Sequence, residues 1–410
     1  MNDNTAHHTD CCVVGGGPAG LVLALLLARN GRPVTVIDKR EHLDREGASH
    51  EPFLSPPSLE LLDRMGLLSA FAQEGQPVRS IHEHRLSGGH STVEYASVPG
   101  SAAPYALSVP LRAMTRILLD ALDREPLATV MPGTGVEGLD IGDEGVVLSV
   151  ERGGAPGRVE CRRLIANDGK FSALRNLAGI EADVRAFDRP LIMAELPLPG
   201  DWPERITAHR DALGTLLATM PVAGGLLTVM WAADPEEWKQ VRSRGVQALR
   251  ERLAPALPGR EGLLEQHVTD WDQVAEIHHH VIRPVRWQRG PFALMGDSAH
   301  GVHSLGAQGL NLAFLDAVAL ADLLTDPLRD TGREPFADYE LLRRPPTERF
   351  QTFQLTLGAL STRPLTPVRH EGLYTTIAET LALGRPEVTA LYERVVARHD
   401  GAAVREESTT

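Results

Sequence analysis

An apolar run interrupted by glycines is the clearest pattern near the start of the chain. Residues 11–14 are apolar and predict a short strand, and the run LVLALLLA at 21–28 beyond the glycines predicts a helix. Residues 33–37 are rich in β-branched side chains and predict a second strand, which Asp38 closes. This order of strand, glycine loop, helix and second strand is typical of a βαβ unit.

The rest of the chain switches between strand-like and helical periodicity. The pattern predicts helices at 58–66, 112–122 and 236–253, strands within 127–167, a sheet within 184–235, a strand at 292–295, and helices from there to about residue 400, broken at 326–327 and 343–346. The last ten residues predict a frayed tail. The chain is therefore expected to be an α/β protein.

Length and charge narrow the possible classes of function. A chain of 410 residues is long enough for two or three domains. Lys and Arg together number 41 against 54 Asp and Glu, which gives a formal net charge of -13. Nucleic acids and anionic membranes attract clustered basic residues, so we expect the chain to bind neither.

The compartment is inferred from the N-terminus, the apolar runs and the cysteines. The first ten residues are polar, and the longest apolar run is far shorter than the roughly 20 residues of a membrane span. Three cysteines without a CxxC pair predict neither a disulfide framework nor a zinc site. The run His278–His280 would alternate between the two faces of a strand, so no metal is expected there. We expect a cytoplasmic protein without a membrane span.

The glycines of the first unit follow the spacing G-x-G-x-x-G. Gly15 would allow the tight turn, Gly17 would let the backbone approach a pyrophosphate, and Gly20 would allow the helix to pack closely on the strand. The helix from about Pro18 would point its free N–H groups at the phosphates. Asp38 would accept hydrogen bonds from ribose hydroxyls. The cofactor-binding residues predicted in this unit are Gly15, Gly17, Pro18, Ala19, Gly20, Asp38 and Lys39.

The alternative for this unit is a doubly wound sheet whose glycines only make a turn. The loop alone also does not distinguish FAD from NAD. Two later segments bear on this choice. In 161–179 a strand leads into Asp168-Gly169, and in 290–324 a strand leads into Gly296-Asp297, a glycine-rich turn and a helix that begins near Gly309.

These three ordered motifs resemble the fingerprints of the class A, single-component FAD-dependent aromatic hydroxylases. The resemblance spans roughly residues 10–350 and includes the segments 54–68 and 339–346. It implies a Rossmann-like FAD-binding domain, an inserted mixed-sheet substrate domain and a helical C-terminal region. The implied bounds are 1–74, 106–180 and 281–330 for the FAD-binding domain, 75–105 and 181–280 for the substrate domain, and 331–410 for the C-terminal region.

The resemblance also assigns roles to individual residues. Asp297 would contact the ribityl and pyrophosphate region, and backbone N–H groups from the turn after it would face the pyrimidine edge of the flavin. The further cofactor-binding residues it implies are Arg112, Asp168, Gly296, Asp297, Gly306, Ala307, Gly309, Leu310 and Asn311. The alternatives are a strand-end cap for Asp297, a plain helix cap for the glycine-rich turn, a turn anchor for Asp168 and a solvated helix side chain for Arg112.

The chain departs from the family pattern at one position near the expected flavin and at one on the expected substrate side. His50 stands where many members carry an arginine near the flavin, and it could titrate near neutral pH or be a surface residue. His303-Ser304 stands where many members have a proline, and a similar histidine occurs in the ubiquinone-hydroxylase branch. His50, His303 and Ser304 are therefore the candidate catalytic residues.

The chemistry implied by the resemblance is that of a monooxygenase. NAD(P)H would reduce FAD, O2 would form a flavin C4a-hydroperoxide, and one oxygen atom would pass to a small aromatic or polycyclic substrate. The predicted substrate domain is rich in Leu, Met and Val, which favours an apolar substrate. An epoxidase, a Baeyer–Villiger enzyme or a reductase on the same scaffold, or a flavin-binding redox protein without turnover, remain alternatives.

Overall fold

The computed structural model describes residues 6–45, 52–85, 89–97, 103–210, 216–326, 335–357, 360–362 and 390–395. Its helices are α1 (Pro18–Arg29), α2 (Pro56–Arg64), α3 (Leu68–Glu74), α4 (Leu111–Leu122), α5 (Ala173–Leu177), α6 (Pro235–Arg244), α7 (Val246–Leu253), α8 (Gly262–His267), α9 (Gly309–Thr325) and α10 (Pro335–Thr356), with four 3-10 turns, η1 (Tyr95–Ser97), η2 (Ala254–Ala256), η3 (Trp271–Gln273) and η4 (Gly296–Ser298). Strands and helices alternate along the first part of the chain, so the α/β class is confirmed.

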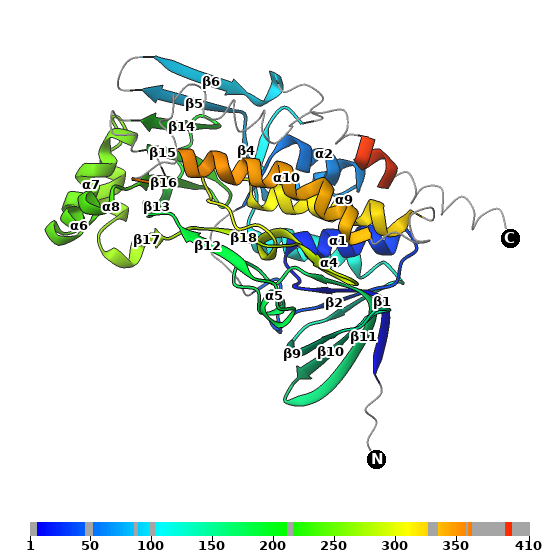
Figure 1. Ribbon diagram of the computed structural model, residues 1–410. Helices are drawn as coiled ribbons and strands as arrows, with labels where there is room; N and C mark the ends of the chain where they lie inside the picture. Colours follow the sequence, from blue (N-terminus) through cyan, green and yellow to red (C-terminus); the bar gives the residue numbers. More distant parts are fainter. Residues whose placement is uncertain are drawn as a thin grey trace.

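The strands form one large sheet in each half of the molecule and two small ones (Figure 1). They are β1 (His7–Val14), β2 (Val34–Ile37), β3 (Phe53–Leu54), β4 (Gln76–Val78), β5 (Ser80–Arg85), β6 (His90–Glu94), β7 (Ala106–Ser108), β8 (Ala128–Met131), β9 (Thr134–Ile141), β10 (Val146–Arg152), β11 (Ala155–Ala166), β12 (Ala182–Ala186), β13 (Leu191–Pro197), β14 (Arg205–Arg210), β15 (Leu216–Val222), β16 (Leu226–Ala232), β17 (Val274–Ile277), β18 (His280–Pro284), β19 (Gln288–Arg289) and β20 (Phe292–Leu294).

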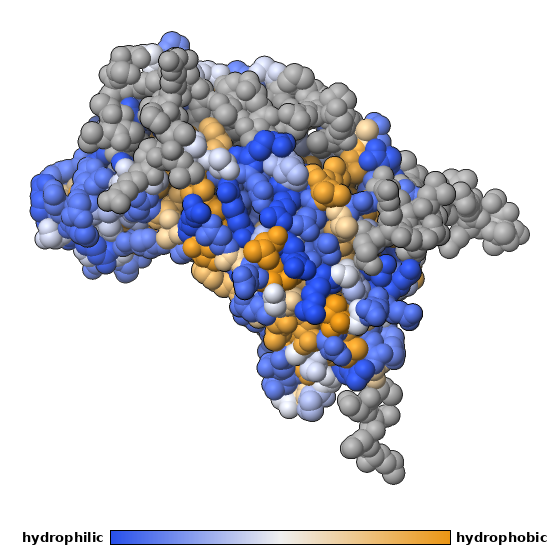
Figure 2. All heavy atoms as spheres, viewed as in Figure 1, coloured by the Kyte–Doolittle hydropathy of each residue, from blue (hydrophilic) through white to orange (hydrophobic). Residues whose placement is uncertain are grey.

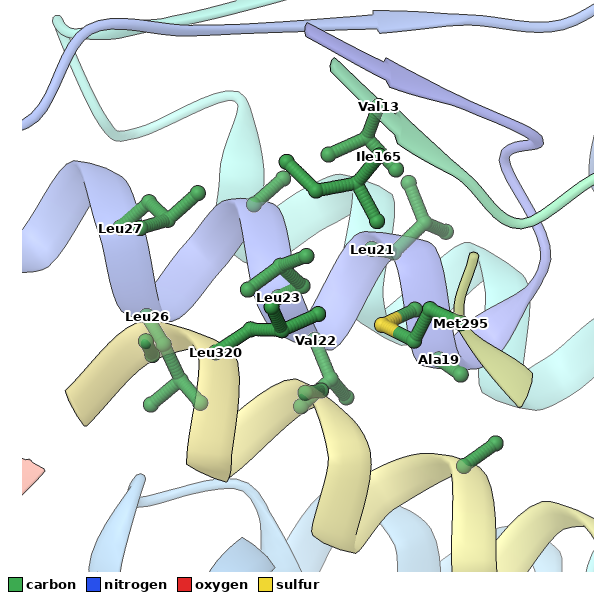
Figure 3. Packing of buried hydrophobic residues seen from close by; sticks show 14 of the residues in the cluster. Val13, Ala19, Leu21, Val22, Leu23, Leu26, Leu27, Ile165, Met295 and Leu320 are labelled. Carbon is green, nitrogen blue, oxygen red and sulfur yellow. The ribbon is translucent and has the colours of Figure 1, made fainter. Parts of the chain in front are cut away.

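The first large sheet has the order β19-β20-β11-β1-β2-β8, and its central strands are parallel. These central strands are buried on both faces, as parallel strands usually are, and all four residues of β2 are buried. Helix α1 lies between the sheet and helices α4 and α9, and its residues Pro18–Ala28 are buried. Figure 3 shows Val22 and Leu26 of α1 beside Leu320 of α9. The Rossmann-like architecture expected from the glycine motif is confirmed.

The second large sheet is the mixed sheet expected between the nucleotide motifs. Its order is β17-β13-β16-β15-β14-β5-β6, and all of its neighbouring pairs are antiparallel except β14 and β5. Helices α6, α7 and α8 cover its outer face through a cluster that contains Trp231 and Trp238. The opposite face, called the inner face here, packs against the segment Val302–Leu305 and against helices α9 and α10.

Two expected helix boundaries were wrong. The helix predicted at 236–253 is two helices, α6 and α7, because Gly245 between them takes a φ of 90°. The break predicted at 343–346 does not occur, since α10 continues through Pro345 and Pro346. Ion pairs from Arg344 to Glu340 and Glu348, one turn to each side, stabilise this part of the helix.

The surface and the chain end complete the fold. Figure 2 shows one face that is mainly hydrophilic, with hydrophobic residues gathered over its middle, where β12, β18 and α5 lie in Figure 1. Within the described residues, no helix is long and apolar enough to cross a membrane. In the segment 390–395, Tyr392 and Val395 are buried in the core of the first sheet. The predicted tail, 401–410, lies outside the described residues.

Candidate active site

The glycine loop is packed so tightly that two of its glycines have no room for a side chain. A Cβ atom on Gly15 would lie 2.2 Å from the carbonyl oxygen of Asn167, and one on Gly20 would lie 2.2 Å from the carbonyl oxygen of Gly15. Gly15 also has a φ of 114°. Gly17 is the N-cap of α1, and no side chain caps that helix. The first N–H groups of α1 and its positive dipole end are therefore available to an anionic ligand.

Asn167 joins the glycine loop to the end of strand β11. Its side-chain amide donates a hydrogen bond of 3.0 Å to the carbonyl oxygen of Gly15, and its backbone N–H donates one to Val14. A Cβ atom on Gly296 would lie 3.1 Å from the side-chain oxygen of Asn167, so this residue reaches all three motifs. Asn167 was not among the residues predicted from the sequence, although its place directly before Asp168-Gly169 was a signal.

Asp38 is buried, and both of its carboxylate oxygens accept hydrogen bonds from the protein. One oxygen accepts from the N–H of Gly16 at 2.7 Å and from Arg40, and the other accepts from the backbone and side chain of Arg40. Burial alone would raise the pKa of Asp38, but the hydrogen bonds and charge of Arg40 outweigh it and hold that pKa below its usual value. Asp38 thus braces the loop, whereas Lys39 beside it is exposed.

Asp168 has one occupied and one unoccupied carboxylate oxygen. Its Oδ2 accepts a hydrogen bond of 3.0 Å from the N–H of Leu174. Its Oδ1 is buried and has no hydrogen-bond partner among the described residues. Arg175 links this motif to the third one by donating a hydrogen bond of 3.0 Å to the carbonyl oxygen of Ser298. A buried acceptor without a partner beside a glycine cradle fits a ligand hydroxyl.

The third motif is held in place by contacts with the buried carboxylate of Asp316. Its Oδ2 accepts a hydrogen bond of 3.1 Å from the N–H of Gly296 and lies 2.5 Å from Nε2 of His300, and its Oδ1 accepts from Nε of Arg343 at 2.9 Å. Burial would raise the pKa of Asp316, but His300 and Arg343 hold it below its usual value. Asp297, next to Gly296, is partly exposed.

The segment after this motif forms the turn that precedes α9. The N–H of Ala307 donates a hydrogen bond of 2.7 Å to the carbonyl oxygen of Ser304. Gly306 and Ala307 both have positive φ, 92° and 52°. Among the described residues, Ala307 is the one residue other than glycine with a positive φ. Helix α9 begins at Gly309 without a side-chain cap, so its N–H groups are also available to a ligand. Leu310 is partly buried.

Asn311 makes contacts that the sequence analysis did not anticipate. Its side-chain oxygen accepts hydrogen bonds from the N–H of Ser55 at 2.9 Å and from the hydroxyl of Ser58 at 2.7 Å. Its side-chain amide donates to the carbonyl oxygens of Phe53 and Ala307. The side chain therefore fastens the segment at 53–58 to the turn before α9.

His303 is the buried candidate among the predicted catalytic residues. Its ring stacks on His279 with centroids 4.0 Å apart and meets Phe187 edge-on. Its Nδ1 accepts a hydrogen bond of 2.9 Å from the N–H of Leu305, so the neutral ring carries its proton on Nε2. Nε2 is buried without a hydrogen-bond partner among the described residues. Burial, together with His279 and Lys170, holds the pKa of His303 well below 6.5.

Two of the remaining predicted residues have exposed side chains, and the third is not described by the structure. Ser304 and Arg112 are exposed. His50 lies outside the described residues. A residue that the sequence analysis missed is Gln354 of α10, which accepts a hydrogen bond from the N–H of His303 and donates to the carbonyl oxygens of His303 and Leu305.

Together these residues have the features that an extended dinucleotide needs. Two helices present uncapped N-termini, the glycine loop leaves room for backbone contact, and Asp168 offers a free buried acceptor. No group of three metal-ligating side chains occurs among the residues that the structure describes. The fold and the site define a dinucleotide-binding protein with a Rossmann-like domain.

Comparisons with known proteins identify the class. A family model described as FAD binding domain matches residues 8–353. The chain is 35% identical to protoasukamycin 4-monooxygenase of Streptomyces nodosus subsp. asukaensis over 98% of each chain. It is also 35% identical to 6-methylpretetramide 4-monooxygenase of Streptomyces rimosus, over 85% of this chain and 83% of the relative. The crystal structure of P. aeruginosa PqsL in complex with 2-aminobenzoylacetate superposes with a TM-score of 0.75 at 22% identity, over 96% of this chain and 100% of that one.

The chain therefore belongs to the FAD-binding family of class A flavoprotein monooxygenases. It is an FAD-dependent monooxygenase of a family whose usual reductant is NAD(P)H. The resemblance found in the three motifs is confirmed.

Proposed function

We propose that the enzyme hydroxylates an apolar aromatic or polycyclic molecule that binds between the inner face of the second sheet and the turn before α9. The observation that carries this proposal is a cluster, called the inner cluster here, in which apolar side chains of four strands meet that turn. Its members from the strands are Leu191, Ala208, Leu216, Ala218 and Ala232, and its members from the turn are Val302 and Leu305. The two relatives named for protoasukamycin and 6-methylpretetramide support a substrate of this kind.

The inner cluster suits oxygen chemistry because it keeps water away. Bound FAD supplies the redox chemistry that activates O2, with electrons from NAD(P)H. The protein has to shield that step, since water would promote loss of the activated oxygen as hydrogen peroxide. Met193 and Met230, which pack against the cluster, add adaptable apolar surface. A large apolar ring system completes such a surface better than a small charged one.

His303 would act on the substrate as a neutral hydrogen-bond donor. Its proton lies on Nε2, because Nδ1 is occupied by the N–H of Leu305. Its lowered pKa keeps the ring uncharged at neutral pH. Gln354 holds the backbone on both sides of the ring and thereby sets its position. A donor of this kind would orient a phenolic or keto oxygen of the substrate for attack at the neighbouring carbon.

The cofactor-binding roles belong to the same proposal. The N-terminus of α1 would hold the pyrophosphate, Asp168 a sugar hydroxyl, and Asp297 with the N-terminus of α9 the ribityl chain and the flavin ring. The domain bounds predicted from the sequence and a cytoplasmic location, where NAD(P)H is available, are also proposed. Three buried free cysteines without a disulfide support that location.

The test is a substrate panel on the purified protein. The protein should carry FAD and oxidise NADPH or NADH slowly on its own. An aromatic or polycyclic compound should accelerate that oxidation, and the product should gain one oxygen atom that derives from labelled O2. A product that differs only by two hydrogens would indicate a reductase, and ring expansion of a ketone would indicate a Baeyer–Villiger enzyme. Either result would contradict the proposed hydroxylation.

A further inference from the structure

A buried ion pair lies on the inner face of the second sheet. Arg210, the last residue of β14, donates a hydrogen bond of 3.1 Å from Nε to a carboxylate oxygen of Glu83 on β5. Their side chains are only 4% and 1% exposed. Strands β5 and β14 are parallel neighbours, and Glu83 is the register partner of Ala208. The pair is therefore held by two adjacent strands of the sheet.

The register shows which face of the sheet carries this pair. Side chains two residues apart on a strand lie on the same face, so Arg210 shares its face with Ala208. Ala208 belongs to the inner cluster together with Val302 and Leu305. Leu216, the register partner of Arg210 on β15, belongs to the same cluster. Arg210 therefore lies on the face that meets the turn before α9, where the substrate is proposed to bind.

The described residues satisfy only part of the hydrogen-bonding capacity of the Arg210 guanidinium. Its two terminal nitrogens, NH1 and NH2, are buried and have no hydrogen-bond partner among the described residues. Among the described residues, Nε has one partner, a carboxylate oxygen of Glu83. An arginine has five N–H donors, and buried donors are nearly always paired because an unpaired one is costly. Unpaired donors at a ligand-facing position indicate that a ligand atom completes them.

We propose that NH1 and NH2 of Arg210 hold an uncharged acceptor oxygen of the substrate, such as a phenol, quinone or ketone oxygen. Glu83 determines this preference, because its carboxylate already balances the charge of the guanidinium. The pair as a whole offers directed donors with little net charge. A substrate carboxylate would be attracted by Arg210 but also repelled by Glu83, and burying its charge would cost more than burying an uncharged oxygen. This inference rests on the proposed function and names the oxygen class that its site selects.

The experiment uses three ring compounds that differ only in their oxygen group. Naphthalene has none, 2-naphthol has an uncharged hydroxyl, and 2-naphthoate has a carboxylate. Binding of each to the FAD-loaded enzyme is followed by the change in flavin absorbance. For the wild-type enzyme we expect 2-naphthol to bind about tenfold to a hundredfold more tightly than naphthalene, the range for one hydrogen bond to a charged group. We expect 2-naphthoate to bind more weakly than 2-naphthol.

Two substitutions then separate the roles of the pair. Arg210→Gln should remove the preference for 2-naphthol over naphthalene, and Glu83→Gln should strengthen 2-naphthoate binding about tenfold because the remaining cation is no longer balanced. The double variant Arg210→Gln with Glu83→Gln removes both charges, so it tests the loss of preference without leaving one buried charge unpaired. Arg79→Gln is the matched control, since Arg79 pairs with Glu204 just before the same two strands but is exposed.

The outcomes distinguish this inference from the proposed function. A wild-type enzyme that binds none of the three compounds overturns both. An enzyme that binds them, but whose double variant keeps the preference for 2-naphthol, overturns the role of Arg210 alone. A wild-type preference for 2-naphthoate likewise overturns it, because the pair would then act as a net cation.

Discussion

The side-chain amide of Asn167 donates a hydrogen bond of 3.0 Å to the carbonyl oxygen of Gly15. These residues are 152 positions apart in sequence, and their contact joins the ends of strands β1 and β11 where the cofactor is expected to bind. The contact orients the glycine loop from outside it. The loop geometry thus depends on a residue of the second motif as well as on its own glycines.

Replacing Asn167 by alanine should therefore weaken FAD binding. We expect a loss of about 1 kcal/mol in the free energy of unfolding, the worth of one ordinary hydrogen bond, and about a tenfold rise in the Kd for FAD. Flavin fluorescence during titration of the apoprotein measures the Kd. Asn176→Ala is the control, because Asn176 is exposed on α5. Equal FAD affinity in the Asn167 variant and the wild type would refute this role.

Gly20→Ala should be far more damaging than an ordinary glycine substitution. The new methyl group would lie 2.2 Å from the carbonyl oxygen of Gly15, a backbone atom that cannot move without opening the loop. We expect a destabilisation of about 3 kcal/mol and loss of bound FAD. Gly200→Ala places the same methyl group in open space and should change neither quantity. Thermal unfolding and the flavin content after purification give the comparison.

Asp316→Asn should weaken the contact between the third motif and α10 and thereby destabilise the protein. The substitution removes the charge that balances Arg343 and leaves that guanidinium in a buried site. Breaking a buried ion pair lowers the free energy of unfolding by about 3–5 kcal/mol. Asp120→Asn, which alters an exposed pair with Arg116 on α4, should have little effect. Urea unfolding of both variants is the measurement, and similar midpoints for the two would contradict the assignment.

The pH dependence of stability should carry a contribution from His303. Its folded pKa lies well below the ordinary 6.5, so the folded protein binds a proton there less readily than the unfolded chain does. The resulting stability is complete above pH 6.5 and is lost as the pH falls below it toward the folded pKa, by at most about 1.4 kcal/mol per pH unit. His303→Asn should flatten the plot of the free energy of unfolding against pH in that window. His278→Asn changes an exposed histidine and should leave the slope unaltered.

His303 should also affect the coupling of NAD(P)H oxidation to product. The substitution His303→Asn keeps a polar group but moves the donor, so we expect kcat for hydroxylation to fall about tenfold to a hundredfold. NAD(P)H oxidation should fall less, with the difference appearing as hydrogen peroxide. His278→Asn is again the control. A variant with unchanged product yield per NAD(P)H would exclude a role for His303 at the substrate.

Local patterns explain which parts of the fold were predictable. The βαβ unit follows from residues close together in the chain, because glycine spacing, an apolar helix and a β-branched strand each act over a few positions. The Pro345-Pro346 pair shows the limit of such patterns. It predicted a break, yet α10 continues, since neighbouring ion pairs and the contact of Arg343 with Asp316 stabilise the helix against its local preference.

The site likewise has one part that the sequence predicted and one part that it did not. The three motifs, and with them the FAD-dependent chemistry, could be identified from the order of residues along the chain. The contact of Asn167 with Gly15, the contacts of Asp316, the hold of Gln354 on His303 and the pairing of Arg210 with Glu83 join residues that are 16 to 152 positions apart. No periodicity records such pairings, because sheet register and helix packing bring the partners together only when the whole chain folds. The packing of the two large sheets therefore decided which polar groups are buried, which are paired, and which remain available to a substrate.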